Sequence, residues 1–161
     1  IGMAGWSGSG KTTLVEQVID LLQARGLAVS LIKHAHHNFE IDHPGKDSYR
    51  HRHAGCREVL ITSAKRWAVV HELRGREELT LNDALAQLSP CDLVIVEGFK
   101  HEAIAKIEIY RAEIGKPLLF PNDPHIIAVA SDAPVETTLP RLDLNQPASI
   151  ADFILKTSSL A

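Results

Sequence analysis

Residues 1–22 have the sequence IGMAGWSGSGKTTLVEQVIDLL, and residues 5–12 within them are GWSGSGKT. This segment fits the Walker A pattern, GxxxxGK followed by Ser or Thr, which forms a phosphate-binding loop where a strand precedes it and a helix follows. An apolar stretch precedes the first glycine, and the spacing of Leu14, Val18 and Leu22 predicts a helix over residues 11–25. We therefore expect a phosphate-binding loop between a first strand and a first helix.

The residue types in this loop predict how it would hold phosphates. Gly5, Gly8 and Gly10 would let the backbone fold around an anion with its N–H groups pointing inward. The positive end of the following helix dipole would add to the attraction. Lys11 would reach the outer phosphates, and the Thr12 hydroxyl would bind Mg²⁺. The alternative is a Gly- and Ser-rich turn with a chance lysine.

The composition is typical of a globular protein. The chain has 161 residues, of which 45% are hydrophobic and 23% charged, which predicts one domain over residues 1–161. The net charge of −3 gives no general attraction to nucleic acid or to an anionic membrane. No apolar run approaches the ~20 residues of a membrane helix. Cys56 and Cys91 have no CxxC spacing, so we expect reduced thiols and a cytoplasmic protein. From the net charge and the short apolar runs, we expect neither nucleic-acid nor membrane partners.

Strand-like and helix-like segments alternate along the chain. The strand-like segments are residues 27–33, 93–98, 106–111 and 126–132, and the later helix-like segments are residues 80–88 and 147–156. This alternation predicts an α/β protein with a P-loop nucleotide-binding fold, in which helices cover both faces of a mostly parallel sheet. Only four residues precede Gly5. A usual strand has ~5–6 residues, so we expect the first strand to be truncated at its start.

Residues 57–73 do not fit this alternation. They contain two short β-rich runs around residues 63–66, which predicts a β-hairpin. We expect it at an edge of the sheet or projecting from it.

Acidic residues at strand ends are candidates for the rest of the site, because ligands of such sheets gather at the carboxyl ends of the strands. Glu97 closes one apolar run and would bind the metal or orient a water, whereas Asp92 begins that run and would lie at the opposite edge. Asp132 closes another run and could accept from the N1–H and N2 amine of guanine. The usual NKxD signature is absent, so a turn-forming aspartate remains the alternative.

The polar segment 34–48 follows the strand after the phosphate helix. Loops in this position order over the terminal phosphate of nucleotide switches, which makes Asp42, Lys46 and Asp47 candidates beside a merely solvated alternative. Six of the nine histidines lie between residues 34 and 53: His34, His36, His37, His43, His51 and His53. They indicate either a transition-metal site or solvated and phosphate-facing side chains.

Four segments taken in order resemble one family: GWSGSGKTTL, LIKHAHHNFEIDHPGKDSYRHRHAG, DLVIVEGFKHEAIAKIEIYR and HIIAVASD. This resemblance, over residues 5–132, is to the molybdopterin-guanine dinucleotide biosynthesis protein B (MobB) family. It implies the fold of signal-recognition and MinD-like GTPases, binding of GTP with Mg²⁺, and at most slow hydrolysis. It also implies a homodimer joined through projecting β-strands, for which the hairpin over residues 57–73 is the candidate element. The partner implied is a MobA-type molybdopterin guanylyltransferase, with the pterin cofactor as a further candidate ligand.

The resemblance also assigns individual residues. The matching nucleotide-binding residues are Gly5, Trp6, Ser7, Gly8, Ser9, Gly10, Lys11, Thr12, Thr13, Asp47 and Asp132. Lys11 and Glu97 would be the catalytic residues of a slow GTPase, and Thr12 and Glu97 the metal ligands. Gly98, Lys100 and His101 match the segment after the acidic strand end.

Three other functions fit parts of the pattern. A small-molecule kinase would use the same loop with an arginine-rich lid, but Arg50, Arg52, Arg57 and Arg66 form no obvious lid in the sequence. A metal-insertion chaperone GTPase would use the histidines, and usually a cysteine beside them. A pure adaptor would hold nucleotide for stability and dock a partner enzyme. We expect a GTP-binding accessory protein of molybdenum-cofactor maturation. It would bind its nucleotide and hydrolyse it only slowly.

Overall fold

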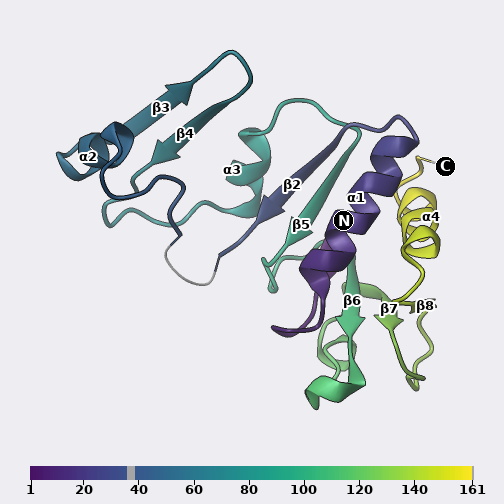
Figure 1. The fold of residues 1–161 in the computed structure, drawn as a ribbon. Coiled ribbons are helices and arrows are strands. Elements are labelled where there is room, and N and C mark those ends of the chain that lie inside the picture. Colours follow the sequence, from purple (N-terminus) through teal and green to yellow (C-terminus); the bar gives the residue numbers. More distant parts are fainter. Residues whose placement is uncertain (36–38, 161) are drawn as a thin grey trace. The chain divides into compact units, whose positions relative to one another are not determined.

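The structure, a computed structural model, describes residues 1–35 and 39–160 (Figure 1). The chain forms two compact units, Ile1–His34 with Leu81–Ala161, and Ala35–Thr80. The single domain over residues 1–161 stays a prediction.

A six-stranded parallel sheet forms the first unit. Its strands, in spatial order, are β2 (Val29–Lys33), β5 (Leu93–Glu97), β1 (Gly2–Ala4), β6 (Lys106–Tyr110), β7 (Ile126–Ser131) and β8 (Arg141–Asp143). Every neighbouring pair is parallel, so the carboxyl ends of all six strands lie along one edge. The predicted α/β fold class with a mostly parallel sheet is confirmed.

Helices cover both faces of this sheet, as the alternation of side chains along β5 shows. Leu93 and Ile95 belong to the core packed under α1 (Lys11–Ala24) and α4 (Pro147–Thr157), together with Val18 and Ile154. Val94 and Val96, which alternate with them, pack in a second cluster with residues of β2 and α3 (Leu81–Ala86). Successive strand residues point to opposite faces, so α3 lies on the face opposite α1 and α4 (Figure 1).

The second unit contains α2 (Asp47–His53), β3 (Glu58–Thr62) and β4 (Trp67–His71). The two strands pair antiparallel and form a separate two-stranded sheet. The predicted hairpin over residues 57–73 is therefore confirmed. Its connection contains a turn in which the Ser63 hydroxyl donates to the carbonyl of Arg66 (3.0 Å).

Within the described part of the chain, no helix has both the length and the apolar character needed to cross a membrane.

Candidate phosphate-binding site

The loop between β1 and α1 has backbone conformations that require glycine. Gly5, Gly8 and Gly10 have φ values of 149°, 84° and 83°. A Cβ at Gly5 would lie 2.4 Å from the carbonyl oxygen of Ile109, a backbone atom of the neighbouring strand β6. The loop can therefore turn out of β1 only where no side chain is present.

Lys11 is the first residue of α1, and its side chain folds back over the loop. Its ammonium donates to the carbonyls of Gly5 (2.8 Å) and Trp6 (2.7 Å). Burial lowers the pKa of Lys11; the Glu97 carboxylate opposes this, and the neighbouring ammonium groups of Lys100 and Lys33 lower it further. The loop thus holds a positive charge at its centre, beside further cations.

The two predicted metal ligands lie next to each other. The Thr12 hydroxyl is 3.5 Å from Glu97 Oε1, to which it donates, and the Lys33 ammonium is 3.5 Å from Oε2. Glu97 ends β5 and is only 9% exposed. A hydroxyl and a carboxylate oxygen side by side are ligands of the kind Mg²⁺ takes when phosphates complete its coordination, so these residues fit that ion.

The hydroxyl side chains of the loop differ in exposure. Ser7, Thr12 and Thr13 are exposed, whereas Ser9 is buried at 1%. The first three are therefore open to a ligand at the loop.

Asp92, which directly precedes the strand that Glu97 ends, accepts a hydrogen bond from the backbone N–H of Ala28 (2.7 Å), which is a structural role away from the loop.

Trp6 ties the loop to the segment that follows β6. Its indole N–H donates to the carbonyl of Pro117 (2.7 Å). The ammonium groups of Lys100 and Lys116 lie 5.7 and 5.8 Å from the ring centroid, within the range of a cation–π attraction. Lys11 thus places a positive charge within the loop, and Lys100 and Lys116 place two more beside Trp6.

The same segment is anchored by a buried carboxylate. Glu108, on β6, has no exposed surface and accepts from the backbone N–H groups of Leu119 (2.7 Å) and Phe120 (2.9 Å). Burial raises the pKa of Glu108, and these two hydrogen bonds oppose the rise.

Arg111 is a site residue that the sequence did not reveal. It directly follows β6, and its guanidinium lies between the loop and Asp132, donating to the Ser9 carbonyl (3.3 Å) and to Asp132 Oδ2 (3.0 Å). The signal in the sequence that could have found it is an arginine at the carboxyl end of the strand-like segment 106–111; that this strand lies next to β1 is known from the structure.

The acidic candidates of the polar segment, Asp42 and Asp47, lie in the second unit. Asp47 begins α2, and its part at the phosphate loop stays a prediction. Asp42 is instead buried against Arg52, whose guanidinium also pairs with Glu40 (2.6 Å) and Glu72 (2.5 Å). The hydrogen bond from Arg52 is the main reason why the pKa of Asp42 is lowered. Asp42 is therefore part of the folded core of this unit.

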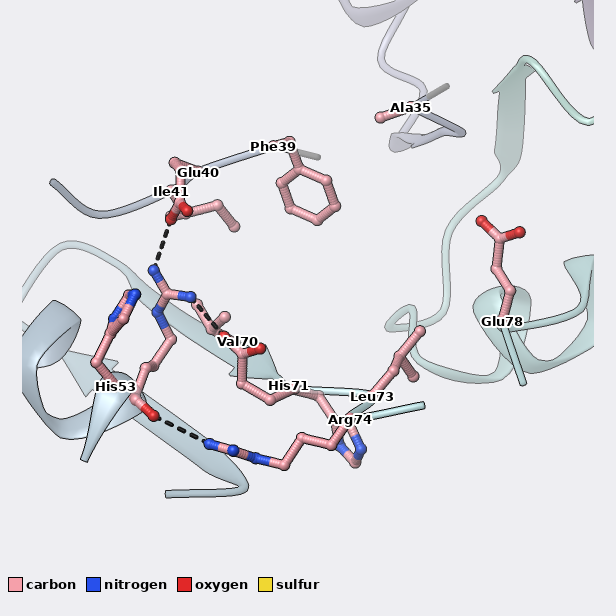
Figure 2. A pocket seen from close by; sticks show the side chains of 12 residues that line it. Ala35, Phe39, Glu40, Ile41, His53, Val70, His71, Leu73, Arg74 and Glu78 are labelled. Carbon is pink, nitrogen blue, oxygen red and sulfur yellow. Dashed lines mark hydrogen bonds and ion pairs between the residues drawn. The ribbon is translucent and has the colours of Figure 1, made fainter. Parts of the chain in front are cut away.

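A hollow of about 700 Å³ opens beside this ion cluster (Figure 2). Phe39 and Ile41 line it from the segment before α2, and Val70 and His71 from β4. All of its lining residues belong to the second unit.

The predicted histidine cluster is only partly described. His36 and His37 lie outside the described residues. Among the residues that the structure describes, no group of three His, Cys, Asp or Glu side chains could hold a metal ion. A transition-metal site that includes His36 and His37 therefore stays a prediction.

The fold and the loop define the class of this protein: an α/β protein with a phosphate loop between its central strand and first helix. The profile of a family described as "Molybdopterin guanine dinucleotide synthesis protein B" (MobB) matches residues 1–132. The chain belongs to this family, as the sequence resemblance predicted.

Individual relatives agree with this assignment. The chain is 45% identical to the molybdopterin-guanine dinucleotide biosynthesis adapter protein of Escherichia coli (strain K12), over 97% of this chain and 91% of that protein. It is 46% identical to the adapter protein of the same name from Haemophilus influenzae, over 96% of this chain and 86% of that protein.

A crystal structure of molybdopterin-guanine biosynthesis protein B has the same fold. Its TM-score is 0.78 at 28% identity, covering 98% of this chain and 97% of that chain. The family and the two relatives together support a role for the chain as an adapter in molybdopterin guanine dinucleotide biosynthesis.

Proposed function

We propose that this adapter binds GTP with Mg²⁺ at residues 5–13 and holds it for a partner enzyme. The observation that supports this most directly is the Lys11 ammonium on the loop carbonyls, beside the exposed hydroxyls at the start of α1. Backbone N–H groups of a glycine-rich loop, a helix N-terminus and a lysine together attract the phosphates of a nucleotide. The net charge of the triphosphate would be offset by this arrangement and by Mg²⁺.

Guanine would be recognised by Asp132. This residue follows β7, the second strand from β1 on the side away from β5, so it lies at the ligand-binding edge beyond the phosphate loop. A carboxylate there can accept from guanine N1–H and the N2 amine, whereas adenine has no such pair of donors. This assignment is part of the proposal.

Hydrolysis would be slow. Thr12 and Glu97 would hold Mg²⁺, which when bound neutralises charge on the outer phosphate oxygens. Glu97 is the candidate for orienting a water, but Lys33 also pairs with it. Arg111 pairs with Asp132 and the inner part of the loop. An arginine aimed at the transferring phosphate is worth ~10³–10⁵ in rate. Because Arg111 is engaged in this way at the loop of the first unit, we expect binding to prevail over turnover.

Calorimetric titration of GTP and ATP, each with and without Mg²⁺, tests this proposal. We expect the protein to prefer GTP and Thr12→Ala to weaken the Mg²⁺-dependent part of the affinity. Asp132→Asn should change the base preference from guanine to xanthine, because the amide N–H₂ of asparagine would then donate to the 2-oxo group of xanthine. Equal affinity for GTP and ATP contradicts guanine selection. Unassisted turnover faster than about one per second contradicts slow hydrolysis.

We further propose that the hairpin joins two copies of the chain. Leu60 and Val69 are directly opposite each other and are 62% and 43% exposed, and Trp67 on the same face is 66% exposed. An exposed apolar face of this kind on a two-stranded sheet favours association. Light scattering should report a dimer that Leu60→Lys with Val69→Lys dissociates and the exposed control Glu77→Lys does not. A dimer that survives the hairpin change contradicts this element of the proposal.

The partner enzyme would be a MobA-type guanylyltransferase, with the pterin as a further candidate ligand. The relatives are called adapter proteins, which supports a role beside such an enzyme. The two free cysteines are consistent with the cytoplasm as the place of action, which remains proposed. Pull-down of a guanylyltransferase with and without MgGTP tests the partnership.

A further inference from the structure

We propose that Arg111 is a positioning residue of the nucleotide site, which joins the phosphate loop to Asp132 and fixes that carboxylate for guanine. This inference rests on the proposed binding of GTP. It adds a determinant of base selectivity that lies between the phosphate-binding and base-binding elements.

The sheet topology places Arg111 between these elements. β6 lies between β1 and β7. Tyr110 pairs with Ser131, so the next residues, Arg111 and Asp132, leave the carboxyl edge of the sheet side by side. The phosphate loop leaves β1 at the same edge, on the other side of β6.

The guanidinium contacts both neighbours. Its Nε donates to the Ser9 carbonyl at 3.3 Å, and Nη1 donates to Asp132 Oδ2 at 3.0 Å. A Cβ placed on Gly10 would lie 3.2 Å from Nε, so the guanidinium packs closely against the loop. The side chains of Arg111 and Asp132 are 30% and 22% exposed, which leaves the pair partly shielded and partly open to a ligand.

The chemistry of the pair suits base recognition next to phosphates. A carboxylate has about four acceptor positions on its two oxygens, so an Asp132 that accepts from Arg111 can still accept from two guanine donors. Without the arginine, this negative charge would repel a nucleotide triphosphate. The planar guanidinium presents N–H groups in fixed directions, so it can reach the loop carbonyl and the carboxylate together, which a single ammonium cannot do in the same geometry.

Titration of MgGTP and MgATP into Arg111→Gln and Arg111→Lys tests the inference. For Arg111→Gln we expect GTP affinity to fall on the order of tenfold and ATP affinity to fall less, so that the GTP/ATP ratio decreases. Arg111→Lys should recover part of the affinity for both nucleotides, because it keeps the charge, but not the ratio. Arg141→Gln removes an exposed arginine from β8 of the same sheet and should leave both affinities unchanged.

The outcomes separate this inference from the proposed function. An unchanged GTP/ATP ratio in Arg111→Gln overturns the positioning role. The positioning role is also overturned if Arg111→Gln lowers the GTP/ATP ratio of the Asp132→Ala variant as much as it lowers the ratio of the wild type. A residue that acts through Asp132 cannot lower the ratio further once Asp132 has been removed. Failure of the wild-type protein to bind GTP at all would instead overturn the proposed function. The Arg111→Lys variant, which retains the charge at the loop, guards against loss of folding as the explanation.

Discussion

At the scale of single residues, the phosphate loop depends on a close approach of two backbones. Gly5 combines a φ of 149° with a position at which a Cβ would meet the Ile109 carbonyl at 2.4 Å. We expect Gly5→Ala to lower the free energy of unfolding by about 2–3 kcal/mol, because backbone strain and a steric clash add together. Chemical denaturation measures this loss, and the affinity for MgGTP should fall with it.

Gly26→Ala is the matched control for this prediction. Gly26 also has a positive φ, of 85°, but a Cβ there would meet nothing within 4 Å. The cost should then be about 1 kcal/mol, from the backbone conformation alone. Equal losses in the two variants would show that the contact with Ile109 is unimportant.

At the scale of elements, the segment after β6 is held by one side chain. Glu108 accepts from two consecutive backbone N–H groups, and a glutamine can accept only through its single oxygen. Glu108→Gln should therefore cost about 1–3 kcal/mol of unfolding free energy, the usual penalty of a buried donor without an acceptor. Hydrogen exchange at Leu119 and Phe120 should accelerate, whereas Glu113→Gln, an exposed change in the same segment, should alter neither quantity.

The pH dependence of this variant has a definite sign. Burial raises the pKa of Glu108 above 4.5 in the folded protein. The folded state thus binds this proton more readily than the unfolded state, and its contribution to stability is lost as the pH rises through the folded pKa. The stability of wild type relative to Glu108→Gln should therefore increase as the pH falls toward 4.5. A difference that is constant between pH 7 and pH 4.5 would contradict the raised pKa.

The stability that Asp42 contributes through its ion pair with Arg52 should respond to acid in the opposite sense. The pKa of Asp42 is lowered below 3.8, chiefly by its hydrogen bond from Arg52. Its contribution is complete above that ordinary value and is lost as the pH falls through the folded pKa. The difference in unfolding free energy between wild type and Asp42→Asn should stay constant from neutral pH to about pH 5 and shrink below pH 3.8.

Glu77→Gln, an exposed change in the same unit, serves as the control for Asp42→Asn. It should differ little from wild type at any pH, because a solvated carboxylate contributes little to stability. An Asp42→Asn difference that persists unchanged into strong acid would show that the carboxylate charge does not stabilise the unit.

At the scale of the whole molecule, the features predicted from sequence are those that depend on neighbours along the chain. The spacing from Gly5 to Thr12 predicted the loop, and the apolar run before Glu97 predicted its strand. The contacts that escaped prediction join residues that no helical or strand spacing relates, such as Arg111 with Ser9, and Arg52 with its carboxylates. The partners of Arg111 depend on strand order and register, and those of Arg52 on the path of the segment before α2, which single-sequence patterns do not specify. The alternation of strand-like and helix-like segments predicted the fold class, and the family resemblance agreed with it, but neither specified these side-chain pairs.

Binding of MgGTP should stabilise the whole chain by mass action. At a ligand concentration of 100 times Kd, the gain is about 2.7 kcal/mol, which should raise the unfolding temperature by roughly 5–10 °C for a chain of this size. Thermal unfolding with GTP, and with ATP as the control, measures this shift. Equal shifts with the two nucleotides would contradict guanine selection.

Hydrogen exchange tests whether both units take part in binding. The loop and the start of α1 should become protected when MgGTP binds, because their N–H groups would then donate to phosphates. If Asp47 belongs to the site, protection extends to the start of α2 in the second unit, and Asp47→Asn removes that extension while weakening GTP affinity. The exposed change Glu77→Gln in the same unit should do neither. Protection confined to the first unit, with unchanged affinity in Asp47→Asn, would limit the nucleotide site to the parallel sheet and its loops. The second unit, with its exposed hairpin face, would then be left to contacts with other protein chains.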